Sequence, residues 1–479
     1  MTTIPAPLKE TNAAQYEEVL RQAYEKAVAY LASLDTAPVA ATADLQTLRR
    51  QLGRPLEERG IAAEQVLADL VADVEGGIIG SAGGRFFGWV IGGAVPAAVA
   101  ADWLTSAWDQ NAAIYATAPG ASVAEEIVGG WLKEILGLPA GASFALTTGC
   151  QMAHVTALSA ARHWVLEQKG WDLVERGLSG APEIRVLASD QKHGSVARAL
   201  RLLGIGRAQV VDLATDGMNR VEAQALEEEL ARNPDAPMIV VLQAGDINTG
   251  GFDDFETLAP MAQARGAWVH VDGAFGLWAG ASEKYRHLAR GVELADSWAT
   301  DGHKWLNVPH DCGYAFVAHP EAHRVALSEK TSYATYVAGA RNEMEWNPEW
   351  SRRARGFATY AALRSLGRSG VSDLVERCCR HAASLGMRIG ELPGAELLAE
   401  PVLNQALVRF VDVKAGATEA DHARRTEEVM ATINETGEAF FTASTWKGRR
   451  VMRISVSSWQ TTDEDVERGV RAVEGVLRA

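Results

Sequence analysis

Cysteine is scarce in this chain of 479 residues, and what is present follows no metal-binding pattern. The four cysteines are Cys150, Cys312, Cys378 and Cys379. No two of them form a CxxC pair, and two adjacent cysteines do not have the spacing of metal ligands. We therefore predict reduced thiols and no bound metal, as is typical of proteins from a reducing compartment.

Excess positive charge and long apolar runs are also missing. Lysine and arginine number 46 against 61 aspartates and glutamates, which gives a formal net charge of -15. A nucleic-acid partner is not expected, because nothing supplies phosphate-neutralising charge.

The longest apolar stretch, residues 88–101, is interrupted by Pro96 and is too short to cross a bilayer. Residues 1–10 show no features of a signal peptide, so the chain is predicted to be cytoplasmic and to have no membrane partner.

The pattern of the remaining chain predicts three parts. Residues up to 84 read as a helical arm whose apolar stripe needs a partner surface. From 85 to 360, apolar strands alternate with helices, which is typical of an α/β domain with a mostly parallel sheet. From 361 to 479, the pattern indicates a smaller α+β domain.

Individual elements can be located from their periodicity. Strands are predicted at 184–188, 208–213, 238–242, 267–271, 313–318, 406–411 and 451–456. Helices are predicted at 153–167, 195–203, 255–264, 374–385 and 463–477. Ligands of open α/β sheets bind at the carboxyl ends of the strands, so a functional residue is expected where strand 267–271 ends.

Two residues near that strand end carry the most chemical information. Asp272 stands in the string HVDGA, and Lys304 follows in the string DGHKW. Alone, either residue could be a strand-end cap or a solvated lysine. Together they meet the needs of pyridoxal phosphate chemistry. The lysine amine forms a Schiff base with the cofactor aldehyde, and the carboxylate keeps the ring nitrogen protonated, so that the ring accepts electrons.

With these strings the chain resembles the group II pyridoxal phosphate-dependent amino acid decarboxylases, which include aromatic-L-amino-acid and glutamate decarboxylases. The resemblance runs from about residue 84 to the C-terminus and is weaker before it. It implies the type I, aspartate aminotransferase-like fold with a seven-stranded sheet. It also implies pyridoxal 5'-phosphate as cofactor and a homodimer with the active site at the interface. Lys304 is then the Schiff-base lysine, Asp272 the partner of the ring nitrogen, and Ala274 a contact of the ring face.

A histidine and a glycine turn extend the resemblance. His193, in SDQKH, takes the place of a family histidine that stacks on the ring, although a histidine before a helix can also be a cap or a core residue. The string LTTGCQ precedes a helix, where free backbone N–H groups and the helix dipole favour phosphate. Many relatives carry serine and alanine there, so backbone contacts are expected rather than side-chain contacts. The residues assigned to cofactor binding in and around this phosphate site are Thr148, Gly149, Cys150, Gln151, Thr300 and His303.

A tyrosine is expected to decide the reaction outcome. The family returns a proton to Cα from a tyrosine on a mobile loop, and counting from Lys304 without a gap places Tyr333 at that position. Tyr336 lies close by and stays an alternative. The segment 328–350 has little periodicity, as expected for a lid. An ordinary surface tyrosine is the other interpretation.

Substrate contacts are predicted at Trp89, Asn111 and Arg453. Trp89 follows the string RFFG, which leads into the pocket in relatives, and Asn111 begins a segment similar to that of glutamate decarboxylases. Arg453 matches an arginine that grips the substrate carboxylate in glutamate decarboxylases. Each could instead serve packing, or pair with an acid.

The resulting prediction is decarboxylation of an L-amino acid to an amine and CO2 through a Lys304 Schiff base. A lyase or a decarboxylating aldehyde synthase on the same fold is the first alternative. The aldehyde synthases usually lack the loop tyrosine, which favours simple decarboxylation. A catalytically silent, cofactor-binding regulator is the second alternative, and the intact set Lys304, Asp272, His193 and Tyr333 argues against it.

Overall fold

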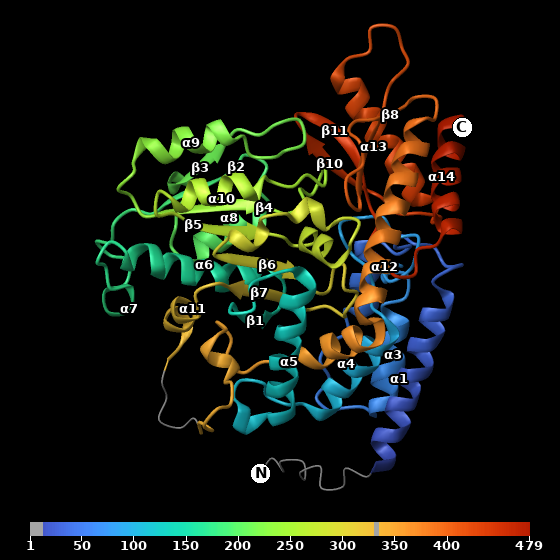
Figure 1. Cartoon of the computed structure of the whole chain (residues 1–479). Helices are drawn as coiled ribbons and strands as arrows, with labels where there is room; N and C mark the ends of the chain where they lie inside the picture. The colour runs from blue at the N-terminus through green and yellow to red at the C-terminus, as the bar shows by residue number, and fades with distance from the viewer. Residues whose placement is uncertain (1–12, 330–334) are drawn as a thin grey trace.

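A seven-stranded sheet forms the centre of the computed structural model, which describes residues 13–329 and 335–479 (Figure 1). The strands are β1 (Ser143–Thr147), β2 (Arg185–Ser189), β3 (Val210–Leu213), β4 (Met238–Gln243), β5 (Trp268–Asp272), β6 (Ser297–Asp301) and β7 (Gly313–Val317). Their order is β1-β7-β6-β5-β4-β2-β3. Only β7 runs antiparallel to its neighbours, so the prediction of a mostly parallel sheet is confirmed.

Helices cover both faces of this sheet, which is why β4 and most of the other strands are rich in apolar residues. Ile239 and Val241 of β4 pack in a cluster with residues of α6 (Cys150–Glu167) and α8 (Gly194–Leu202). Val240 and Leu242 point to the opposite face, in the cluster that includes α10 (Phe255–Gln263). The period-two alternation of a strand thus divides one continuous apolar run between two layers.

A second sheet of four strands lies beside the first, at the upper right of Figure 1. It consists of β8 (Ala395–Leu397), β9 (Gln405–Phe410), β10 (Thr442–Trp446) and β11 (Arg449–Ser455), in the antiparallel order β10-β11-β9-β8. Two helices, α13 (Glu419–Glu435) and α14 (Asp463–Arg478), pack with it. This is the α+β arrangement predicted for the C-terminal part.

The remaining helices connect and extend these layers. They are α1 (Ala13–Ser33), α2 (Leu45–Leu52), α3 (Ala63–Asp73), α4 (Pro96–Trp108), α5 (Pro119–Leu136), α7 (Leu173–Arg176), α9 (Ala223–Arg232), α11 (Pro320–Leu327) and α12 (Gly356–Gly390). α12 is broken at Gly367, whose φ of 62° is left-handed. The division of the chain at residues 84 and 360 stays a prediction, and residue 360 falls within α12.

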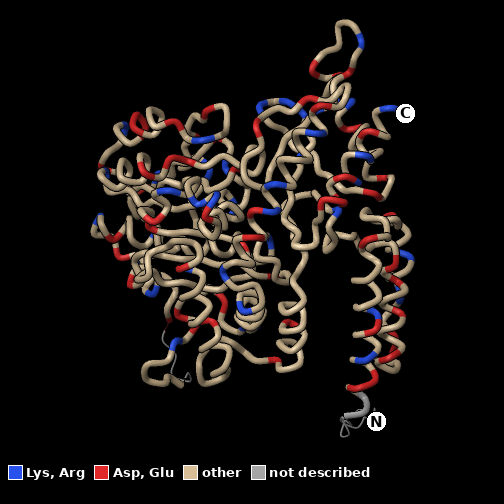
Figure 2. The backbone as a smooth tube through the Cα atoms, turned by 45° about the vertical axis from the view of Figure 1, so that its right-hand side comes forward, with Lys and Arg blue, Asp and Glu red and all other residues tan. Residues whose placement is uncertain are grey.

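The N-terminal helices project from the body of the molecule (Figure 2). The outer face of α1 exposes a stripe of apolar side chains at helical spacing: Tyr16, Leu20, Tyr24, Val28 and Leu31. Exposed apolar side chains in such a stripe cost free energy in water.

Several elements escaped sequence interpretation. β1 and β6 carry serine, threonine or aspartate among few apolar residues, so they give no strand signal. Both strands pair with β7, and Ala145 of β1 and Ala299 of β6 pack in a cluster with Cys150 and Ala153 of α6. Each of the four cysteines is free and buried. Within the described ranges, no helix has the length and apolarity that crossing a membrane requires.

Candidate active site

One cavity of ≈ 450 Å³ lies where the strand ends of the large sheet meet the N-termini of α6 and α8. Its lining contains most of the predicted site residues: Thr148, Gly149, Cys150, Gln151, His193, Ala274, His303 and Lys304. They come from four separate segments of the chain. Asp301 and Arg198 also line the cavity and were not predicted.

Lys304 forms an ion pair inside this cavity. Its Nζ lies 3.0 Å from Oδ2 of Asp301, and Oδ1 of Asp301 accepts the Cys150 backbone N–H at 2.5 Å. Burial alone would lower the pKa of Lys304, but the adjacent Asp301 carboxylate outweighs it, and the pKa is raised. The position of Asp301, three residues before Lys304 at the end of β6, was the available sequence signal for this missed residue.

The turn before α6 requires glycine at position 149. Gly149 has a φ of 145°, and a Cβ there would meet Cε1 of His303 at 3.0 Å. His303 accepts the Cys312 N–H on Nδ1 at 3.1 Å, which leaves its Nε2 directed at Asp301, 3.5 Å away. Burial lowers the pKa of His303 to about 4, so the ring is neutral. The turn, His303 and Asp301 therefore form one packed unit at the positive end of α6.

Asp272 ends β5 two residues before Ala274 of the cavity lining and is 7% exposed. Its Oδ1 accepts the Ala274 N–H at 3.2 Å and lies 3.6 Å from Nε2 of His154. Burial alone would raise the pKa of this carboxyl, but His154, His193 and Lys304 nearby hold it below the ordinary value. Asp272 is thus an ionised carboxylate among three basic side chains.

His193 caps helix α8 and lines the cavity, while its predicted stacking on the cofactor ring stays a prediction. Its Nδ1 lies 2.7 Å from the Ser195 hydroxyl and accepts the Ser195 N–H at 3.2 Å, which caps α8. The side chain is exposed and also lines the cavity. Desolvation by the surrounding walls lowers its pKa, so the ring is neutral near pH 7. Thr300, in contrast, is fully buried, and its hydroxyl donates to the Ala274 carbonyl at 3.4 Å.

Trp89 and Arg453 lie together. The guanidinium of Arg453, which is 6% exposed, donates from Nη2 to the Trp89 carbonyl at 2.9 Å and to Ser455 at 3.2 Å. Its Nε has no hydrogen-bond partner within the described part of the chain. Burial lowers the pKa of Arg453 to about 10, which still leaves it charged at neutral pH, and its charge acts on His193.

Comparison with known proteins shows the family of the chain. Residues 46–411 match the family model described as the pyridoxal-dependent decarboxylase conserved domain. The chain belongs to this family. Its cofactor is pyridoxal phosphate, and its reaction is the decarboxylation of an amino acid, as predicted from the sequence.

Individual relatives of this decarboxylase differ in the substrates that their names give. An aromatic-L-amino-acid decarboxylase of Bacillus atrophaeus is 26% identical, over 95% of this chain and 94% of its own length. An L-2,4-diaminobutyrate decarboxylase of Rhizobium meliloti is 30% identical, over 80% of this chain and 76% of its own. Among solved structures, Oryza sativa TDC with PLP and tryptamine has a TM-score of 0.91 at 23% identity, covering 99% of both chains. This likeness confirms the predicted type I fold.

The cavity fits the cofactor. Its lining includes Gln151, whose side-chain Nε2 is buried with no partner among the described residues and therefore offers a donor to an anionic group.

Cys150, His154 and Asp272 also bring three ligand atoms within 4.8 Å of one another, a spacing that a metal ion could use. Burial raises the pKa of the Cys150 thiol well above its usual value, so it stays protonated and is a poor metal ligand.

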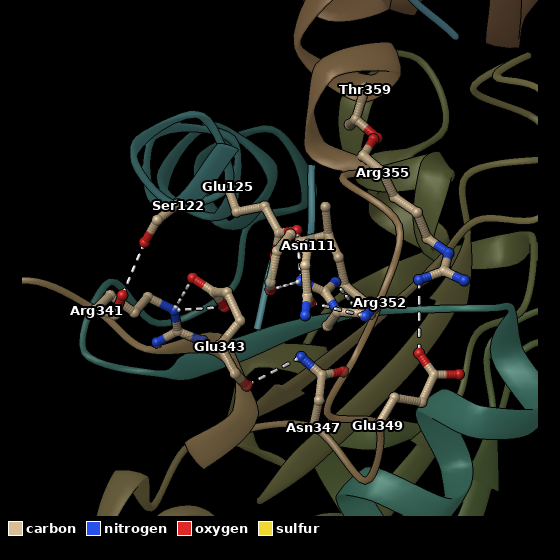
Figure 3. Close-up of polar contacts among 12 residues, drawn as sticks. Asn111, Ser122, Glu125, Arg341, Glu343, Asn347, Glu349, Arg352, Arg355 and Thr359 are labelled. Atoms are coloured by element: carbon tan, nitrogen blue, oxygen red, sulfur yellow. Dashed lines mark hydrogen bonds and ion pairs between the residues drawn. The ribbon is translucent and has the colours of Figure 1, made fainter. Parts of the chain in front are cut away.

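Asn111 belongs to a different cluster of polar side chains, which includes Arg352 and Glu125 (Figure 3). Its Oδ1 accepts the Arg352 N–H at 3.2 Å. Arg352 forms a 2.6 Å ion pair with Glu125, and both side chains are fully buried. Arg352 also donates to the Leu146 carbonyl of β1 at 2.7 Å. The cluster thus joins the segment around Arg352 to α5 and to the large sheet. A substrate contact for Asn111 stays a prediction.

Glu125→Ala should destabilise the decarboxylase by about 3–5 kcal/mol, because Arg352 would keep a buried charge without its partner. Chemical denaturation would measure the loss. The double variant Glu125→Leu/Arg352→Met should lose less than Glu125→Ala, since it leaves no unpaired charge. As a control, Glu321→Ala, in an exposed pair with Arg324, should leave the midpoint unchanged. If Glu125→Ala kept the denaturation midpoint of the wild type, the ion pair between Glu125 and Arg352 would not contribute to stability as described.

Proposed function

We propose that this cavity is the active site, with Lys304 as the covalent anchor of the cofactor and Asp272 as the partner of its ring nitrogen. The observation that carries the proposal is the meeting of Lys304, His193 and the α6 turn in one cavity, above a buried, ionised Asp272. Bound pyridoxal phosphate supplies an electron sink for the electron pair that the departing CO2 leaves behind.

The phosphate is assigned to the start of α6. Gly149, Cys150 and Gln151 present this helix end to the cavity, and His303 packs against it. Thr148 lines the same wall. Thr300 supports the site indirectly, since its hydroxyl holds the carbonyl of Ala274. Ala274 is then in place to contact the cofactor ring, with His193 on the other wall.

Each residue around the cofactor is assigned a separate role in the reaction. Lys304 must lose its proton to react, and Asp301, 3.0 Å away, is the nearest acceptor. Asp272 holds a proton at the ring nitrogen by its negative charge. Arg453 is proposed to bind the substrate carboxylate, supported by its buried charge and unpaired Nε. Trp89, whose carbonyl anchors Arg453, forms the adjoining wall. Tyr333 lies outside the described residues and is proposed as the proton donor to Cα.

A homodimer is proposed as the working form. The exposed stripe on α1 is joined by further exposed apolar side chains on α3 and α4: Val66, Leu70, Trp103, Leu104 and Trp108. Helical faces of this composition are stable when they pack against another copy. The cytoplasmic location stays a prediction.

The direct test is release of CO2 from a panel of amino acids, with mass detection of the products. Aromatic, acidic and diamino acids all belong in the panel, because relatives named for aromatic amino acids, diaminobutyrate and aspartate are similar to this chain. An amine from at least one substrate is expected. Retention of pyridoxal phosphate without release of CO2 from any member would favour a silent regulator instead.

The loop tyrosine separates amine from aldehyde formation. Tyr333→Phe should lower the yield of amine by at least about 10²-fold, because the phenol no longer returns a proton to Cα. Dioxygen can then oxidise the unprotonated product, so aldehyde, ammonia and hydrogen peroxide should appear with matching oxygen uptake. Phenylacetaldehyde synthase of Arabidopsis thaliana, 23% identical over 93% of this chain, shows that such an activity is named among the relatives.

Tyr336→Phe is the matched variant, since Tyr336 lies three residues away and is 44% exposed. It should keep the amine yield of the wild type. The opposite result, with Tyr336→Phe losing amine and Tyr333→Phe keeping it, would assign the proton donor to Tyr336.

A further inference from the structure

A chain of buried polar side chains runs away from Asp272 into the large sheet. His154 Nε2 lies 3.6 Å from Oδ1 of Asp272, and its Nδ1 lies 2.9 Å from Nε2 of His270. His270 Nδ1 lies 2.9 Å from the Ser297 hydroxyl, which also accepts the indole N–H of Trp268 at 2.8 Å. Both histidines and Ser297 are fully buried. Helix α6 and strands β5 and β6 each supply part of this chain, and its members were not predicted from the sequence.

The hydrogen bonds that connect these side chains can all be donated in one direction, towards Asp272. The indole N–H of Trp268 can only donate, so the Ser297 oxygen accepts from it and can pass its own hydrogen to Nδ1 of His270. His270 then donates from Nε2 to His154, and His154 carries its hydrogen on Nε2, facing Asp272. The reverse direction would point an imidazole lone pair at a carboxylate, which is electrostatically unfavourable.

Both imidazoles are neutral. Burial lowers the pKa of His270 to about 3, and burial also lowers the pKa of His154, although Asp272 and Asp301 oppose the change. A neutral histidine has one donor and one acceptor nitrogen, so fixing one nitrogen fixes the other. His154 therefore has a defined tautomer, held from behind by His270.

We propose that His154 is a positioning residue that directs an N–H dipole at Asp272 and so keeps the shared proton on the ring nitrogen of the cofactor. This inference rests on the proposed function. In a site of low dielectric, a carboxylate and a protonated ring nitrogen can lower their energy by moving the proton to the carboxylate. A donor aimed at the carboxylate lowers its proton affinity and opposes that transfer.

Other groups also face Asp272. Lys304 and the Ala274 N–H stabilise its negative charge, and His193 from the start of α8 also lies near it. The neutral Cys150 thiol lies 3.4 Å from Nε2 of His154. Lys304 and His193 are engaged by cofactor and substrate in the proposed function. His154 is buried beneath them, so its contribution persists through the reaction.

The test is the ¹⁵N NMR signal of the ring nitrogen in holoenzyme loaded with ¹⁵N-labelled pyridoxal phosphate, recorded against pH without substrate. The wild-type signal is expected at the protonated position throughout the stable pH range. In His154→Leu the ¹⁵N chemical shift should move towards the unprotonated value, by more than half of the difference between protonated and unprotonated cofactor. The Kd for the cofactor should rise by about tenfold. His154→Gln, whose amide N–H can replace the Nε2 donor, should restore most of the signal.

Two further variants keep the test decisive. If His154→Leu does not fold, Ser297→Ala removes the oxygen that orients His270 and that also accepts the Trp268 indole N–H, and it should move the signal in the same direction by a smaller amount. His323→Leu removes an equally buried histidine, bonded to Ser143 and the Trp346 carbonyl, and should leave the signal unchanged. A wild-type signal in His154→Leu, or in Ser297→Ala if the former is unfolded, overturns the inference.

Asp272→Asn separates this inference from the proposed function. If it leaves the signal unchanged, Asp272 is not the partner of the ring nitrogen and the proposed function itself fails. If Asp272→Asn moves the signal and His154→Leu does not, only the role of His154 fails.

Discussion

Lys304→Ala is expected to abolish the visible absorption that marks the covalent link between enzyme and cofactor. Amine formation should fall by roughly 10³-fold or more, because the amine that anchors the cofactor and is displaced by the substrate is lost. Lys304 is the only lysine in the cavity lining of the described chain, and Asp301 would lose its ammonium partner. Absorption spectra of the purified protein with added pyridoxal phosphate, and CO2 release, measure the two effects.

The matched control is Lys169→Ala, which removes an exposed lysine between α6 and α7. It should keep both the wild-type spectrum and the wild-type rate. A Lys304→Ala protein that retained the visible band would show that another amine holds the cofactor. Reduction with borohydride followed by peptide mapping would then identify that amine.

The residues that could be predicted from the sequence are those whose role follows from their position at a strand or helix end. Asp272 ends β5, Lys304 follows the end of β6 by three residues, and His193 precedes α8. Because these ends meet on one side of the sheet, adjacency in space follows from local patterns alone. The cavity brings Lys304 and His193 together in this way.

The polar contacts that were not predicted are those between segments that lie far apart in the sequence. His154 and His270 lie 116 residues apart in the chain, and only the packing of α6 on β5 brings them to 2.9 Å. From the sequence alone, a histidine inside an apolar helix is interpreted as a buried core residue. Asn111 and Arg352, 241 residues apart, are joined in the same way. Periodicity describes which face of an element is buried, but not which polar groups meet there.

The site also shows why Asp301 was missed. It is a strand residue in a short, mixed-polarity segment, and its carboxylate is stabilised by two donors from different elements, the Cys150 N–H and Lys304. A buried aspartate needs such partners, and they become visible only when α6 is seen against β6. The same helix end that is proposed to bind the phosphate thus already holds an anion.

Asp272→Ala should nearly stop catalysis and weaken cofactor binding. Loss of the carboxylate removes the negative charge that keeps the ring nitrogen protonated, and an unprotonated ring is a poor electron sink. We expect amine formation to fall by about 10³-fold, comparable to the loss of an electrostatic stabiliser in other enzymes. The Kd for the cofactor should rise by at least about tenfold, the effect of losing a hydrogen bond between charged groups. Fluorescence titration of the apoenzyme and single-turnover CO2 release would measure these changes.

Asp253→Asn provides the comparison, because Asp253 is also buried and accepts two backbone N–H groups, from Val221 and Gln243, each at 2.7 Å. That variant should lose stability while its cofactor affinity and its rate per folded molecule stay near the wild-type values. Loss of activity in both variants to the same degree would indicate a general effect of disturbing the sheet. Loss confined to Asp272→Ala would place the effect at the ring nitrogen, because Asp272, unlike Asp253, lies beside His154 and Lys304.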